Sequence, residues 1–147
     1  MIIIYSSHHH GNTEKLVKKV VDGTDIKVIS VEDAFNIDFN EYNCIGFASG
    51  IDFGKFYPDI IEIAKKIPEN KNVFAIFTCA SVNSKMGGQI REIAELRNCK
   101  FLGKYGCKGY NTYGPWKLIG GMNKNHPNED EINEGKKFIE NIIKELE

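Results

Sequence analysis

The sequence lacks the features that mark membrane-spanning, secreted or metal-binding proteins. No apolar run approaches the ~20 residues that a membrane-spanning helix needs. The first residues, Met1–Tyr5, carry neither a basic leader nor a small-residue cleavage site, so we do not expect a signal peptide. The cysteines show no CxxC spacing and no metal-ligand grouping, which favours free thiols in a reducing cytoplasm. They are Cys44, Cys79, Cys99 and Cys107.

The chain also lacks a strong net charge. Its 19 Lys and Arg residues nearly balance its 20 Asp and Glu residues, and the formal net charge is −1. Charge therefore gives no general attraction to nucleic acid, and we expect neither a nucleic-acid nor a membrane partner. The distribution is nevertheless uneven, because the stretch from Asn98 to Asn128 contains five lysines and no acidic residue. With 147 residues, the chain fits one domain, residues 1–147.

Apolar runs alternate with amphipathic stretches along the whole chain. This alternation predicts strands that are separated by helices, and so a mostly parallel sheet covered on both faces. Pro58 suits the first turn of a helix, and Asn128 with Glu131 predicts a capping box at the start of the last one. The expected strands are 2–5, 26–31, 44–49, 73–78 and 101–107, and the expected helices begin near Asn12, Pro58, Met86 and Asn128.

In an open parallel sheet, ligands bind beyond the carboxyl ends of the strands. The first loop at that edge, Ser6–Thr13, joins a buried strand directly to a helix. A helix start presents unpaired N–H groups and the positive end of a dipole, and both suit a phosphate. The loop contains neither a GKS/T motif nor GxGxxG, which disfavours ATP-type and dinucleotide sites. The other loops expected at this edge are Gly50–Tyr57, Cys79–Ser84 and Lys108–Trp116.

These features resemble the flavodoxin family. Hydroxyl residues that lead into Gly11-Asn12-Thr13 are similar to the family's phosphate loop, and Cys44–Tyr57 is similar to its third strand with the flavin loop. The stretch Gly109–Gly121 resembles a segment of small flavodoxin-like proteins. The resemblance implies an α/β, three-layer flavodoxin-like fold with a five-stranded parallel sheet of order 2-1-3-4-5, the fold for which flavodoxin is itself the standard example.

The resemblance also implies an FMN site and a role in electron transport. The expected activity is a flavoprotein that shuttles one or two electrons between redox partners. The alternative is an oxidoreductase on the same fold, a flavin-dependent NAD(P)H or quinone-type reductase. The expected cofactor-binding residues come from the four loops, and no residue is expected to be catalytic or to bind a metal. They are Ser6, Ser7, His8, His10, Gly11, Asn12, Thr13, Ser49, Gly50, Ile51, Asp52, Phe53, Gly54, Phe56, Tyr57, Thr78, Cys79, Ala80, Ser81, Cys107, Gly109, Tyr110 and Trp116.

Some residues leave more than one interpretation open. The run His8-His9-His10 is either a solvated loop or a source of one imidazole that contacts phosphate or flavin. Cys79 and Cys107 end neighbouring expected strands, either as buried thiols or as a redox pair. The lysine-rich stretch is either ordinary solvation or a positive patch that attracts a partner. In the second case the patch attracts either a redox partner protein that is acidic at the contact or the phosphates of a nucleotide.

Overall fold

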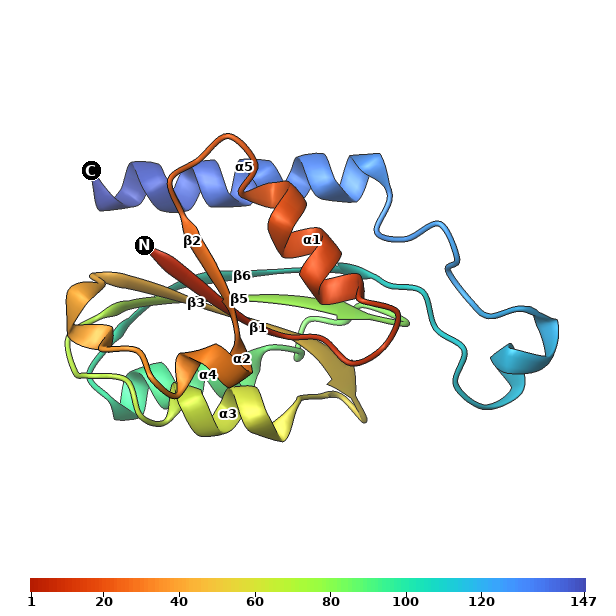
Figure 1. The fold of residues 1–147 in the computed structure, drawn as a ribbon, viewed down its shortest axis with the longest axis horizontal. Helices are drawn as coiled ribbons and strands as arrows, with labels where there is room; N and C mark the ends of the chain where they lie inside the picture. The colour runs from red at the N-terminus through yellow and green to blue at the C-terminus, as the bar shows by residue number, and fades with distance from the viewer.

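The computed structural model describes all 147 residues, and these form a central sheet between two layers of helices (Figure 1). The strands are β1 (Ile2–Ser6), β2 (Lys27–Ser30), β3 (Cys44–Asp52), β4 (Lys55–Phe56), β5 (Asn72–Cys79) and β6 (Lys100–Lys108). The α-helices are α1 (Asn12–Val20), α2 (Val31–Ala34), α3 (Pro58–Ala64), α4 (Gly88–Leu96) and α5 (Glu129–Leu146). Two 3₁₀ helices, η1 (Phe39–Glu41) and η2 (Gly114–Ile119), lie in the connections.

The sheet confirms the predicted topology. Its order is β2-β1-β3-β5-β6, and all four of these pairings are parallel, which is the order 2-1-3-4-5 for the five expected strands. One strand was not predicted: β4 pairs antiparallel with the end of β3, so part of the expected loop Gly50–Tyr57 is a hairpin. None of the helices combines the length and apolar character needed to cross a membrane.

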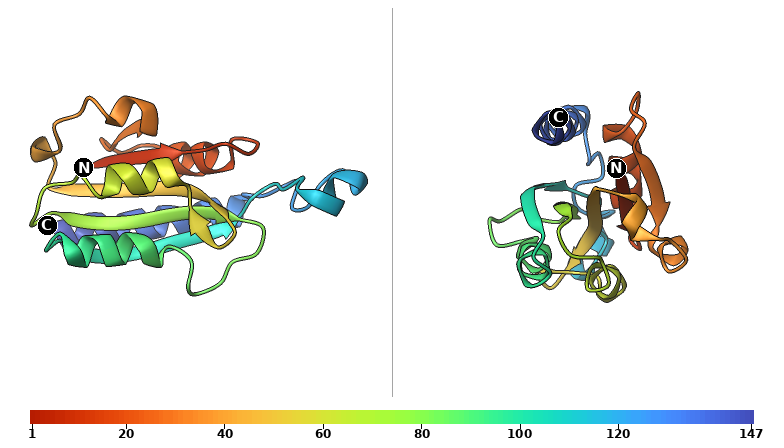
Figure 2. Two further views of the ribbon diagram at one scale, coloured as in Figure 1. Left: turned by 90° about the horizontal axis from the view of Figure 1, so that it is seen from below. Right: turned by 90° about the vertical axis from the view of Figure 1, so that its left-hand side faces the viewer.

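Helices cover both faces of the sheet, as the apolar strands require. Helices α1 and α5 lie on one face, and α2, α3 and α4 lie on the other (Figures 1 and 2). The larger core cluster, of 20 buried residues, lies under α2, α3 and α4, and the smaller, of 12, lies under α1 and α5. The predicted capping box of α5 is present, because Asn128 and Glu131 each accept a hydrogen bond from the other's backbone N–H. The carboxyl ends of the parallel strands lie together at one edge of these layers.

Two phenylalanines of the central strand β5 lie against glycines on its neighbours. Phe74 is the register partner of Gly46 on β3, and Phe77 is the partner of Gly106 on β6. A Cβ atom added at Gly46 would lie 2.3 Å from Cζ of Phe74, and one added at Gly106 would lie 2.1 Å from Cε2 of Phe77. The rings thus occupy space that the missing side chains leave, one ring on each face of the sheet.

Residues 109–127, which we call the arm, extend away from the layered body (Figures 1 and 2). The arm leaves the end of β6, turns through η2 and returns to the start of α5. Its two sides pair at Asn111 and Met122 through two backbone hydrogen bonds, of 2.8 and 2.5 Å. The arm is thus a long loop whose two sides pair with each other, and it adds no further layer to the fold.

Candidate functional site

The carboxyl ends of β1, β3, β5 and β6 meet at one edge and surround a cavity of about 770 Å³. This volume lies within the range of ~300–1,000 Å³ that is usual for small-molecule sites. Each of the four predicted loops contributes to the lining, which also includes Met86 and Lys117. The lining residues among the predicted ones are Ser7, His10, Asn12, Thr13, Gly50, Ile51, Asp52, Phe53, Gly54, Tyr57, Thr78, Cys79, Ala80, Ser81, Gly109 and Tyr110.

The loop between β1 and α1 presents a row of unpaired backbone donors. None of the N–H groups from Ser7 to Gly11 donates a hydrogen bond within the protein, and the N–H of Thr13 has no acceptor either. His10 and Gly11 both have left-handed backbone conformations, with φ values of 55° and 65°. Where the backbone passes from a negative φ at His9 to a positive φ at His10, successive N–H groups can turn toward one concave side, which is the arrangement of an anion-binding nest. The positive end of the α1 dipole lies at the same place.

The three adjacent histidines diverge. His8 approaches Asp59 on α3 (Nε2–Oδ2 3.3 Å), His9 approaches Asp52 (Nε2–Oδ1 3.6 Å), and His10 contacts the hydroxyl of Thr112 on the arm at 3.0 Å. His9 and His10 line the cavity, whereas His8 lies outside its lining. Each imidazole therefore ties the loop to a different neighbouring segment.

Ser6, at the end of β1, faces away from the cavity. Its side chain is buried and donates a hydrogen bond to Oδ2 of Asp59 at 2.8 Å. Ser6 Oγ also lies 3.1 Å from Nε2 of His8. Neither residue lines the cavity, so the structure places both of these predicted residues behind the loop that they support.

Asn12 and Thr13, the first residues of α1, are buried and hydrogen-bonded at the cavity wall. Asn12 joins the loop to the arm, because its Nδ2 donates to the carbonyl of Tyr110 (2.8 Å) and its Oδ1 accepts from the Tyr110 N–H (3.1 Å). The hydroxyl of Thr13 lies 2.8 Å from that of Thr78 on β5. If Thr78 donates in this pair, the proton of Thr13 stays free for a ligand.

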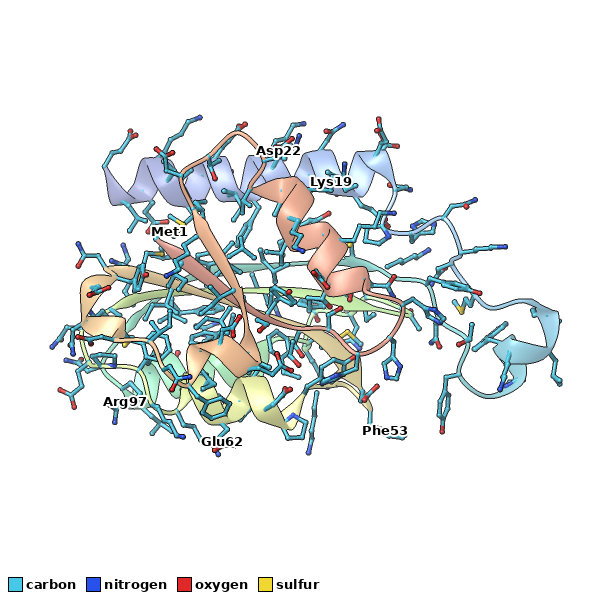
Figure 3. The ribbon with its side chains drawn as sticks, viewed as in Figure 1. Met1, Lys19, Asp22, Phe53, Glu62 and Arg97 are labelled. Atoms are coloured by element: carbon cyan, nitrogen blue, oxygen red, sulfur yellow. The ribbon has the colours of Figure 1, made fainter.

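The β3–β4 hairpin forms a second wall. Phe53 and Gly54 have positive φ values of 50° and 78°, as a two-residue hairpin turn requires, and they join Asp52 to its partner Lys55. Phe53 is 90% exposed at the rim of the cavity, at the edge of the molecule in Figure 3. Gly50 and Asp52 also line the cavity, so the hairpin offers both peptide groups and an aromatic ring to a ligand.

The two aromatic residues after the hairpin turn, Phe56 and Tyr57, lie in different environments. Tyr57 lines the cavity and is almost wholly buried, and burial, with Asp52 and Asp59 nearby, raises the pKa of its phenol to about 12. Its N–H donates to Oγ of Ser49, which is buried in the sheet outside the lining. Phe56 packs on Phe77 in the core, with 6.2 Å between the ring centroids, and does not reach the cavity.

The thiols of Cys79 and Cys107 are buried and free. Cys79 donates to the carbonyl of Cys107 at 3.6 Å, and only Cys79 lines the cavity. Burial raises the pKa of the Cys79 thiol to about 11 and that of Cys107 still further. The thiolate is the reactive form of cysteine, and neither residue carries an appreciable fraction of it at neutral pH.

The arm closes the cavity on the side of β6. Five of its residues join the lining although they were not among the predicted site residues: Asn111, Thr112, Tyr113, Gly114 and Lys117. His9 and Met86 were missed as well. Of the predicted residues, Gly11 shapes the first loop and Trp116 lies on the arm, but neither is in the lining. Apart from Met86, the missed residues lie within the predicted loops or directly after one, so the extent of each loop was the available signal.

Three comparisons place this geometry among known proteins. A family model described as a flavodoxin domain matches residues 2–108. An uncharacterized protein of Methanocaldococcus jannaschii is 38% identical over 146 residues, with 97% of each chain covered. A short-chain flavodoxin associated with a bacterial microcompartment superposes with a TM-score of 0.67 at 11% identity and covers 99% of this chain and 97% of its own. A flavoprotein from Lactobacillus acidophilus, solved in complex with FMN, has a TM-score of 0.55 at 20% identity and covers 73% of this chain and 90% of its own.

Proposed function

Because the chain belongs to the flavodoxin family, we propose that it binds FMN at the described cavity and carries electrons between redox partners. The observation that supports this most directly is the row of unpaired N–H groups from Ser7 to Gly11. Unpaired donors at a helix start are expected to have an acceptor, and a phosphate supplies several oxygens to one concave loop. The FMN in the Lactobacillus acidophilus complex is consistent with this proposal.

The loop can hold a phosphate without a basic side chain. No lysine or arginine occurs between Ser6 and Thr13, so backbone N–H groups, hydroxyls and the helix dipole would supply the attraction. Ser7 and Thr13 line the cavity with hydroxyl groups, although Ser7 Oγ also accepts weakly from the N–H of Glu14, at 3.4 Å. In this proposal Thr13 donates to the phosphate while it accepts from Thr78.

The remaining walls suit a flat ring with a polar edge. Tyr57, Tyr110 and Phe53 offer aromatic surface, and the peptide groups of Gly50 and Asp52 offer donors and acceptors. Bound FMN would supply the redox chemistry, and the protein would supply binding, orientation and electrostatics. Asp52 is the one acidic side chain in the lining, so its charge would disfavour reduction of the bound flavin.

The absorption spectrum of the purified protein tests this proposal, together with titration of the flavin-free protein. We expect a two-band flavin spectrum and release of FMN on denaturation. Riboflavin should bind at least ~100-fold more weakly than FMN, because it lacks the phosphate that meets the unpaired N–H groups. Equal affinities for FMN and riboflavin would contradict the role of the loop, and failure to bind any flavin would contradict the proposal as a whole.

A second candidate function is a flavin-dependent NAD(P)H or quinone-type reductase. The observation that favours it is the extension of the cavity wall along the arm to Tyr113, Gly114 and Lys117. Such a wall could hold a second molecule beside the flavin. Steady-state oxidation of NADH and NADPH, with and without a quinone, separates the two functions. Turnover at ~1–10³ per second would favour the reductase, and much slower turnover favours the carrier.

A further inference from the structure

The tip of the arm exposes apolar side chains to an unusual degree. Leu118 is 89% exposed, Ile119 is 73% exposed and Tyr113 is 72% exposed, and Trp116 among them is 40% exposed. The backbone of this segment is nevertheless hydrogen-bonded, because Gly121 N–H donates to the Trp116 carbonyl at 2.6 Å. Exposed apolar side chains that gather within one short segment, as these do, are typical of an interaction surface.

The arm and the strand that leads into it carry lysines and no acidic residue. Of the five lysines between Asn98 and Asn128, Lys100 pairs with Glu145 on α5 (Nζ–Oε1 2.8 Å), and Lys104 donates to the carbonyls of Ser84 and Met86. The other three lysines, Lys108, Lys117 and Lys124, are exposed and have no acidic partner within ion-pair distance. The structure thus separates two lysines that serve the fold from three that leave uncompensated charge near the arm.

The apolar and charged features meet at the cavity. Tyr113 and Lys117 both line it, and the ring of Tyr113 lies 6.4 Å from that of Phe53 across the rim, in an edge-to-face arrangement. His10 contacts Thr112, which joins the arm to the proposed phosphate loop. Anything that covers the arm tip would therefore sit beside the opening through which electrons would pass.

We propose that the arm tip is a docking surface for a redox partner protein whose contact face carries carboxylates around an apolar patch. The inference rests on the proposed function, because it places the partner next to the bound flavin. Three unpaired lysines favour negative charge opposite them, and the exposed Trp116, Leu118 and Ile119 favour apolar area. Electron exchange between two copies of this chain would produce no net transfer. An electron carrier needs a different redox protein at its docking surface.

The test compares two probe proteins of opposite charge with the FMN-loaded protein. The acidic probe is a plant-type [2Fe–2S] ferredoxin, which in its reduced state loses one electron from the iron–sulfur centre to the bound flavin. The basic probe is cytochrome c, which in its oxidised state takes one electron from the reduced protein. We expect the ferredoxin rate to fall about tenfold as salt rises from 0.05 to 0.5 M, because the Debye length shrinks from ~14 Å to ~4 Å. The cytochrome rate should stay level or rise.

Charge reversal locates the effect. The Lys108→Glu, Lys124→Glu variant should lose most of the salt-sensitive rate with ferredoxin and keep its FMN affinity, because neither residue lines the cavity. The matched control is Lys19→Glu, Lys65→Glu, which changes the net charge equally at exposed lysines on α1 and after α3. If both variants slow the reaction equally, net charge alone acts and the docking surface is refuted.

The apolar part has its own readout, which does not depend on electron transfer. Trp116 is the only tryptophan of the chain, so its fluorescence reports binding at the arm tip. Oxidised ferredoxin should quench it saturably, and Leu118→Ser should weaken this binding about tenfold. Leu96→Ser is the control, because Leu96 is 86% exposed on α4, away from the arm. Equal loss in both variants, or no saturable quenching, would overturn the proposal.

Two further measurements exclude other occupants. Sedimentation that shows a dimer lost on Leu118→Ser would assign the surface to a second copy and overturn the proposal. A blue shift of Trp116 on vesicles that contain phosphatidylglycerol would assign it to a membrane and overturn it equally. A monomer indifferent to vesicles is expected. If no flavin binds at all, the proposed function fails, whereas flavin binding without the charge-dependent rates refutes the docking surface alone.

Discussion

Asn12 joins the proposed phosphate loop to the arm, and its replacement by alanine should destabilise the protein measurably. The side chain makes two hydrogen bonds to the backbone of Tyr110, at 2.8 and 3.1 Å, and it is only 9% exposed. A hydrogen bond of this kind contributes a net ~0.5–1.5 kcal/mol, so Asn12→Ala should lower the free energy of unfolding by about 1–3 kcal/mol. For a chain of this length, that corresponds to a fall in Tm of roughly 3–10 °C.

Urea denaturation of the flavin-free protein measures this change without a contribution from ligand binding. Asn12→Asp should lie between the wild type and Asn12→Ala, because it keeps the acceptor for the Tyr110 N–H and loses the donor to the Tyr110 carbonyl. Asn141→Ala is the control, since Asn141 is exposed on α5 and should change stability by less than about 0.5 kcal/mol. If Asn12→Ala is as stable as Asn141→Ala, the link between loop and arm contributes nothing and the reasoning is wrong.

Other predictions concern the cavity itself. Thr13→Val should weaken FMN binding about 10- to 100-fold in a fluorescence titration, because it removes a hydroxyl donor to a charged group, and an unchanged affinity would remove Thr13 from the site. Asp52→Asn should raise the reduction potential of the bound flavin by ~20–40 mV; the effect is modest because Asp52 is half exposed and pairs with His9. Burial raises the pKa of Cys79 from 9.0 to about 11, so the thiol ionises first in the unfolded state. The free energy of unfolding, measured by urea titration, should therefore fall as pH rises from 9.0 to about 11. In Cys79→Ala it should fall less over the same range, and identical pH profiles for the two proteins would contradict this.

The alternation of apolar strands with helices predicted a parallel sheet, and the resemblance to flavodoxins implied its order; the structure confirms both. The strand ends at Ser6, Ser49, Thr78 and Cys107 lie together as expected. The sequence did not predict the direction in which individual side chains point. Ser6 carries the residue type expected at a phosphate loop, yet its hydroxyl turns to Asp59, which is 53 residues away in the chain.

The hairpin and the arm show two other limits of the sequence. The turn at Phe53 and Gly54 was hidden because phenylalanine rarely adopts a positive φ, so the pattern did not suggest a two-residue turn. The arm residues that line the cavity were hard to choose from the sequence because the arm has no periodic pattern, and its path depends on contacts such as the pairing of Asn111 with Met122. Tertiary contacts of this kind decide what a local pattern leaves open.

Two phenylalanines of β5 lie over glycines on neighbouring strands, and this packing restricts the order in which substitutions at these positions can be accepted during evolution. Alanine at position 46 would meet the ring of Phe74, and alanine at position 106 would meet the ring of Phe77, so either step taken first is harmful. Loss of the ring first leaves a cavity that the later alanine partly fills. Substitutions at each pair are thus expected to be epistatic, and homologues should differ at positions 46 and 74 together, and at 77 and 106 together, rather than at one position alone.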